Sequence, residues 1–146
     1  MAVKTVLPAV VALAGLSAYL SDPPAGLAGP APALTQVRVH AVRSTRSNQV
    51  WEYPSPYSFA TPGDHAGPFL QVAVLETGYS SWRQAVFNGT PMRLVESIPQ
   101  VNASRTVWGY IRVFQYDGAF ASGSFSYQAD SMVYPYRRLS TLFTIR

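Results

Sequence analysis

Cysteine is absent from this sequence of 146 residues, and its absence excludes several kinds of chemistry together. A chain without thiols forms no disulfide, carries no thiolate nucleophile, builds no zinc-thiolate site and holds no lipoprotein anchor. The compartment stays open, because many exported bacterial proteins have no disulfides.

Charge is also scarce: 12% of the residues are charged, whereas 48% are hydrophobic and 13% are aromatic. General acid and base catalysis needs titratable side chains close together, and the chain after residue 34 has few of them. They are Glu52, Asp64, Glu76, Glu96, Asp117, Asp130, His40 and His65. They match no common catalytic or metal-binding spacing, so we expect no catalytic residue, no metal and no cofactor.

One pair leaves an enzyme as an alternative. Asp64 and His65 are the only acid and imidazole that adjoin in the sequence, and they lie in the loop 61–68. Adjacent residues in a loop rich in Gly and Pro are usually turn formers. A small hydrolase that uses Asp64 and His65 is therefore kept as the second alternative function.

The net charge of +4 is not arranged as a nucleic-acid surface. Ten of the eleven basic residues are arginine, and no run of them exceeds two. A dedicated nucleic-acid binder concentrates its basic residues in a stripe or patch. We therefore expect no nucleic-acid partner.

Helical periodicity is missing after residue 34, where short β-branched and aromatic runs alternate with Gly, Pro and Asn. Two strands are expected between residues 105 and 129, and the others at 35–43, 49–53, 69–76, 82–87, 90–95 and 139–145. A tight turn at Asn88-Gly89 joins two of them. This pattern predicts an all-β fold, a single antiparallel β-sandwich of about eight strands that is immunoglobulin-like or similar.

The most regular stretch, Arg105–Ala129, predicts one long hairpin folded at Asp117-Gly118. A two-residue turn would place the aromatic side chains of both strands on one face. We expect this face to be core, because large aromatic side chains are usually buried. Its members are Trp108, Tyr110, Phe114, Phe125 and Tyr127. The alternative is an exposed aromatic platform for sugars or nucleobases.

The first 34 residues have a different composition from the rest. Residues 1–20 place one Lys before an apolar run and resemble a secretory signal, and residues 21–34 form a linker of Pro, Ala and Gly. The β-sandwich domain is expected at 35–146. We expect an exported protein, extracellular or periplasmic, whose first 33 residues add nothing to its fold. An uncleaved membrane anchor or a virion arm is the alternative.

Two loops carry aromatic side chains that no local structure requires. Pro residues in both loops would stiffen them, and rigid aromatics with guanidinium groups suit shallow recognition of ligands. The expected binding residues are Trp51, Tyr53, Tyr57, Tyr134, Tyr136, Arg137 and Arg138. This requires both loops to lie at the same end of the sandwich. The alternative is that the aromatic side chains of the two loops fold back and cover the open ends of the sandwich.

Several short motifs after Leu34 resemble a YolA-like family of small exported bacterial β-proteins. They are Leu34-Thr35 at the first strand, Glu76-Thr77-Gly78-Tyr79, Gly109-Tyr110, and Tyr134-Pro135 before the last strand. The function of that family is unassigned, so the resemblance implies export and brings no active site with it.

These observations favour a non-enzymatic module, exported or on a surface, that acts by binding or assembly. The expected partners are a glycan, an anionic polymer, a protein surface or further copies of the chain. A membrane would be contacted only through residues 1–20, if they are not cleaved. The first alternative is a structural subunit of an assembled particle, such as a virion decoration or appendage protein with an ordered N-terminal arm.

Overall fold

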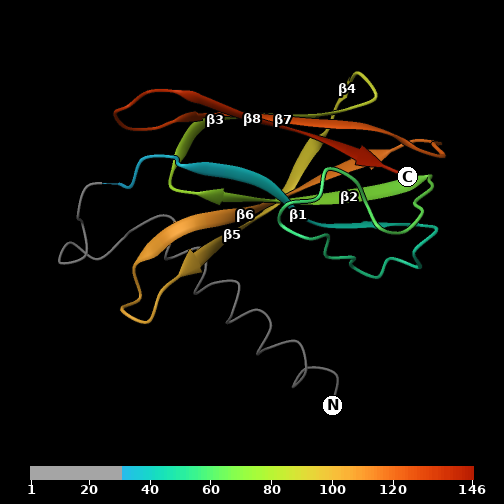
Figure 1. Ribbon diagram of the computed structural model, residues 1–146, viewed down its shortest axis with the longest axis horizontal. Helices are drawn as coiled ribbons and strands as arrows, with labels where there is room; N and C mark the ends of the chain where they lie inside the picture. Colours follow the sequence, from blue (N-terminus) through green and yellow to red (C-terminus); the bar gives the residue numbers. More distant parts are fainter. Residues whose placement is uncertain (1–30) are drawn as a thin grey trace, which may run out of the picture.

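Eight β-strands and no helix form the part of the chain that the structure, a computed structural model, describes: residues 31–146 (Figure 1). They are β1 (Gln36–Ser44), β2 (Phe69–Thr77), β3 (Ser80–Phe87), β4 (Thr90–Pro91), β5 (Arg93–Val101), β6 (Val107–Asp117), β7 (Gly123–Ser131) and β8 (Arg138–Ile145). Within these residues no helix is long and apolar enough to cross a membrane.

The strands form four consecutive antiparallel hairpins that alternate between two sheets. One sheet has the order β1-β2-β6-β5 and the other has the order β4-β3-β7-β8. The central strands pair over long stretches, β2 with β6 and β3 with β7, which joins the two hairpins of each sheet. The prediction of a single antiparallel β-sandwich of about eight strands is confirmed.

The sandwich has two ends that matter for the placement of candidate sites. At the tip end, β1 begins and the turn between β7 and β8 projects. At the loop end, β1 finishes and residues 45–68 begin, and β8 also finishes there. Figure 1 shows the tip end on the left and the loop end on the right.

The predicted hairpin at Asp117-Gly118 is wrong. β6 pairs with β2 and β5, while β7 pairs with β3 and β8, so residues 118–122 pass from one sheet to the other. The two strands differ in their outward faces: Ile111 and Val113 of β6 are apolar and covered, whereas Ser124 and Ser126 of β7 face outward. The two strands fit different sheets, and this burial pattern overrides the local turn signal.

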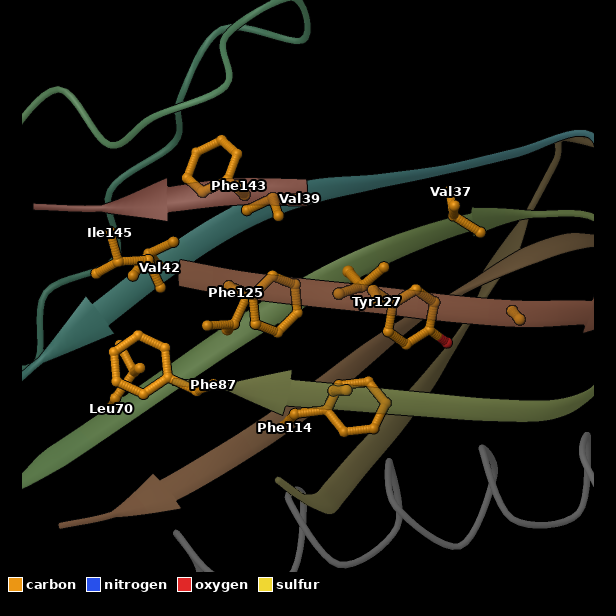
Figure 2. Packing of buried hydrophobic residues seen from close by; sticks show 14 of the residues in the cluster. Val37, Val39, Val42, Leu70, Phe87, Phe114, Phe125, Tyr127, Phe143 and Ile145 are labelled. Carbon is orange, nitrogen blue, oxygen red and sulfur yellow. The ribbon is translucent and has the colours of Figure 1, made fainter. Parts of the chain in front are cut away.

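The core lies between the sheets and contains most of the predicted aromatic side chains. Phe114 of β6 and Tyr127 of β7 meet across it with ring centroids 5.4 Å apart, and Phe125 is fully buried (Figure 2). Tyr110 is half-buried, and Trp108 is 37% exposed because it stands where β6 begins at the tip end. The predicted burial of Trp108 is therefore wrong, and its truncation should cost less than a core aromatic.

The other strand predictions have mixed outcomes. The turn at Asn88-Gly89 is confirmed, with φ of 48° and 81° at its two residues. Residues 49–53 are not a strand and contribute only a bridge between Val42 and Glu52. The strand expected at 90–95 is divided into β4 and the longer β5, which reaches the other sheet.

The domain begins slightly earlier than predicted. Leu34, which we assigned to the linker, is fully buried, and its N–H donates to Ser131 Oγ. The carbonyl of Pro32 accepts a hydrogen bond from Tyr79 N–H, so residues 32 and 33 also contact the domain. The signal-like segment 1–20 and linker residues 21–30 lie outside the described residues.

Candidate functional site

Residues 45–68 close the open side of the sandwich between its edge strands β1 and β8. The backbone of Glu52 exchanges two hydrogen bonds with Val42 of β1, with N–O distances of 2.8 and 2.9 Å. Further along, the backbone of Ala60 forms a bridge to Thr144 of β8. The segment thus crosses from one sheet to the other.

A buried histidine fastens this segment from inside. His65 is almost completely buried, with Nδ1 2.9 Å from Ser44 Oγ and Nε2 3.1 Å from Glu52 Oε1. Glu52 also accepts a hydrogen bond from Gly63 N–H. A hydroxyl, an imidazole and a carboxylate in this order could activate a nucleophile, but Ser44 is fully buried and no substrate reaches it. The arrangement therefore holds the loop onto β1.

The pair Asp64 and His65 is not brought together as a catalytic dyad. The Asp64 carboxylate is exposed and lies 3.9 Å from the guanidinium of Arg46, whereas the His65 ring faces Ser44 and Glu52. The acid partner of the ring is Glu52. The geometry gives no support to a hydrolase built on Asp64 and His65.

The seven expected binding residues do not form one surface. Trp51, Tyr53 and Tyr57 belong to the loop that starts at the loop end, whereas Tyr134 and Tyr136 belong to the turn between β7 and β8, which lies at the tip end (Figure 1). The loops lie apart because β1 and β7 run in opposite directions along the sandwich. The prediction of a single site made from both loops is wrong.

The second loop divides its two arginines between different roles. Arg138 is bound to the Asp130 carboxylate at 2.6 and 3.0 Å and lies over the ring of Trp82, so it is a structural residue. This ion pair lowers the pKa of Asp130 and raises that of Arg138. Within the described residues, no hydrogen bond or ion pair engages the Arg137 side chain.

The first loop contributes to a groove on the outer face of the sheet β1-β2-β6-β5. Two adjoining cavities of about 290 and 150 Å³ share Trp51, Glu96 and Val113. We call their union the face groove; its other lining residues are His40, Ala41, Arg43, Tyr53, Gln71, Ala73, Val95, Ile98 and Ile111. Small side chains form its floor, so the ring of Trp51 and the strand β5 stand as walls on either side.

The aromatic wall is held in place by several contacts. Trp51 packs on Ala41, Ala73 and Val113, and the guanidinium of Arg43 lies 4.4 Å from the centre of its ring. Tyr53 meets His40 edge to face at 5.4 Å and keeps 63% of its surface exposed. Trp51 is thus a fixed wall, and Tyr53 is the ring that a ligand can reach.

A ladder of polar side chains crosses the same face toward the loop end. Arg43 donates to Gln71 at 2.8 Å, Gln71 donates to Gln115 at 2.9 Å, and Gln115 donates to Asp117 at 2.8 Å. Arg93 completes it through the other oxygen of Asp117. Each side chain fixes the orientation of the next, so the groove meets a preorganised polar border.

Two titratable groups line the groove without strong partners. Among residues 31–146 the Glu96 carboxylate forms no hydrogen bond or ion pair. Burial, with a smaller effect from Arg38, lowers the pKa of His40, so its ring is neutral at pH 7 and both donates and accepts hydrogen bonds.

A second polar cluster, which the sequence analysis missed, lies inside the sandwich. Glu76 is fully buried and accepts from Tyr127 Oη and Ser80 Oγ at 2.5 Å each, and from Arg112 Nε at 3.2 Å. Arg83 Nε lies 3.5 Å from the same carboxylate. The sequence signal was present, because Glu76 and Arg112 occupy inward positions of strands that are otherwise apolar.

Comparison with known proteins adds family membership and no activity. No curated protein matches the chain. The resemblance to YolA-like proteins stays a prediction. A family model matches residues 29–145, almost the whole of the described chain, and the protein therefore belongs to the family of the domain of unknown function DUF4879.

Proposed function

We propose that the protein is an exported module that binds a neutral glycan in the face groove. One observation carries the proposal: the exposed ring of Tyr53, the Glu96 carboxylate, which is unpaired within residues 31–146, and the Arg43–Gln71 end of the polar ladder line two adjoining cavities. Export rests on the signal-like composition of residues 1–20.

A sugar ring has the two kinds of surface that the groove complements. Its C–H face is apolar and stacks on an aromatic ring, which Tyr53 provides. Its hydroxyl groups each donate and accept, and they match the acceptor Glu96 and the neutral ring of His40. The groove consists of two adjoining cavities, which suits a chain of sugars better than one compact ligand.

The charge of the groove favours neutral glycans over acidic ones. Arg43 is already engaged by Gln71 and Trp51, whereas the Glu96 carboxylate is free to face the ligand. A carboxylate or sulfate on the sugar would be repelled by Glu96, because like charges cost free energy when water is displaced between them.

Calorimetric titration of neutral and acidic polysaccharide fragments tests this function. Tyr53→Ala and Glu96→Gln should each weaken neutral glycan binding by about tenfold or more. The matched control is Tyr57→Ala, since Tyr57 is in the same loop, is 89% exposed and does not line the groove. Wild-type affinity in both groove variants, or no binding to any fragment, would contradict the proposal.

Assembly is the second candidate, and the edge strand β5 favours it. β5 is an edge strand of its sheet, and its residues Leu94, Val95 and Val101 are exposed. An exposed apolar edge is a surface on which another chain can add a strand. A large native complex that Val95→Lys dissociates would support a particle subunit, and a monomer would exclude it.

A further inference from the structure

The turn between β7 and β8 presents a rigid apolar surface to solvent. Within residues 132–137, Tyr134 is 81% exposed, Tyr136 is 75% exposed and Met132 is 46% exposed. The two tyrosine rings contact each other edge to face at 6.4 Å. We call this group the aromatic tip, and nothing in the described part of the chain covers it.

Hydrogen bonds at its base hold the aromatic tip in shape. Ser131 N–H donates to the carbonyl of Arg137, and Ser131 Oγ donates to the carbonyl of Val133 at 2.8 Å. Met132 N–H donates to the carbonyl of Tyr79 at 2.9 Å. This hydrogen bond ties the tip to the connection between β2 and β3. A preformed surface loses little conformational freedom when it binds a partner.

The surface around the aromatic tip is positively charged. In the half of the domain at the tip end, Arg38, Arg105, Arg137 and Arg138 reach the surface, and the partly exposed Arg83 lies beside the buried Glu76. Asp130 is the carboxylate of that half of the described domain that reaches the surface, and it is bound to Arg138. At the loop end the arginines Arg43, Arg46, Arg93 and Arg146 are matched by Glu52, Asp64, Glu96 and Asp117. The net positive charge of the domain is therefore concentrated at the tip end.

The chain joins the domain at this same end. Tyr79 donates its N–H to the carbonyl of Pro32 and accepts from the N–H of Met132, so the start of the domain adjoins the aromatic tip. The apolar run from Thr5 to Ser21 precedes this point by ten residues, which span at most about 35 Å when extended. If residues 1–20 are kept as an uncleaved anchor, the membrane that receives them lies within reach of the tip.

We propose that the aromatic tip docks on the surface of an anionic phospholipid bilayer. Tyrosine is favoured at membrane–water interfaces, where its ring meets the acyl boundary and its hydroxyl meets water, and Tyr134 and Tyr136 offer this chemistry. Met132 adds apolar surface beside them. Arg137 contacts lipid phosphate, and the neighbouring arginines add long-range attraction. This surface is separate from the face groove and does not depend on glycan binding.

A fluorophore at a single cysteine tests the contact directly, because the natural chain has no cysteine to compete for the label. Full-length protein is labelled with an environment-sensitive dye at Met132→Cys, or at Ser55→Cys in the opposite loop as the matched position. Vesicles contain phosphatidylcholine alone, or phosphatidylglycerol as about a third of the lipid. This readout reports the tip even if residues 1–20 bind the vesicle independently.

The emission at Met132→Cys should shift to the blue with anionic vesicles, and high salt should reverse the shift. The dye at Ser55→Cys should not respond. No shift at Met132→Cys, or an equal shift at both positions, would overturn the proposal. A shift with pure phosphatidylcholine that salt leaves unchanged would overturn the part assigned to anionic lipid.

Substitutions at the tip provide the second arm. Tyr134→Ser with Tyr136→Ser should abolish the blue shift of the Met132→Cys dye, and Arg137→Gln should weaken the response about fivefold at low salt. Tyr53→Ser with Tyr57→Ser is the matched control at the other loop and should leave the response intact. The variants at Tyr134, Tyr136 and Arg137 should bind glycan as the wild type does. A failure of membrane docking and a failure of the glycan proposal are therefore distinguishable. An unchanged dye response in the tip variants would overturn the assignment.

Discussion

The hydroxyl of Tyr127 donates a 2.5 Å hydrogen bond to Glu76 across the interface between the two sheets. Glu76 lies on β2 and Tyr127 on β7, and the same carboxylate also binds Ser80 of β3 and Arg112 of β6. These are the four central strands of the sandwich. A single buried anion thus connects every central strand.

Glu76→Gln should destabilise the domain by about 3 to 5 kcal/mol, because it leaves the guanidinium of Arg112 buried without its counterion. Urea unfolding followed by fluorescence measures the effect. The control is Glu96→Gln, since Glu96 is exposed and unpaired among the described residues, and it should change stability by less than about 0.5 kcal/mol. Equal midpoints for the two variants would show that the cluster does not stabilise the fold.

Stability should fall at high pH because of Tyr127. Burial, followed by the charge of Glu76, raises the pKa of Tyr127 above its unfolded value near 10. The folded state therefore keeps a proton that the unfolded state loses, and this contribution, fully present below about pH 10, declines by about 1.4 kcal/mol per pH unit above it.

Tyr127→Phe should remove this part of the alkaline slope, while Tyr57→Phe should leave it unchanged. Unfolding free energies between about pH 9 and pH 11 provide the measurement. Some slope will remain in Tyr127→Phe, because burial also raises the pKa of Tyr79. If the unfolding free energy of Tyr127→Phe fell with pH as steeply as that of the wild type, groups other than Tyr127 would cause the loss of stability at high pH.

His65→Ala should cost about 1 to 3 kcal/mol, because Ser44 and Glu52 lose the ring that both contact. The segment 45–68 should also become sensitive to limited proteolysis. Asp64→Ala is the matched neighbour: its carboxylate is exposed, and the variant should behave as the wild type does. Resistance of His65→Ala to protease would show that the histidine does not hold the loop.

Two glycines with positive φ should respond differently to alanine. Gly89→Ala should lower the free energy of unfolding by about 1 kcal/mol, because φ is 81° and alanine is strained there. The new Cβ adds no clash, since it would meet no atom within 4 Å. Gly78→Ala, with φ of 98°, should cost about 1 to 3 kcal/mol more, since its Cβ would strike the backbone of Ala33 and Leu34. Thermal unfolding compares them. Similar losses of stability in the two variants would mean that the backbone of residues 33 and 34 shifts easily to make room for the new Cβ.

The sequence predicts the layers of this fold better than the pairing within them. Alternation of apolar and polar residues identifies most strands, and Asn88-Gly89 is a correct turn because its strands lie in one sheet. Asp117-Gly118 carries the same local signal, yet long-range burial decides which sheet each flanking strand joins. Local turn chemistry holds no information about that choice.

The candidate site was only partly predictable for the same reason. Trp51 and Tyr53 were identified as binding candidates by their unexplained aromatic character, and both line the face groove. Glu96 was identified only as a titratable residue, because nothing in the sequence shows that β5 faces Trp51 across β2 and β6. Residues that meet only through strand order are invisible to local patterns.

The alternation of hairpins between the sheets has a consequence for how fast the chain folds. Each hairpin closes locally, but β2 must find β6 and β3 must find β7 across some forty residues. Non-local pairing of this kind slows folding to milliseconds or seconds, since the loop must close before the contacts form. During that time we expect β6 and β7, which flank a strong local turn signal in the sequence, to compete to pair with each other. We therefore expect the misleading signal at Asp117-Gly118 to act as a kinetic trap during folding.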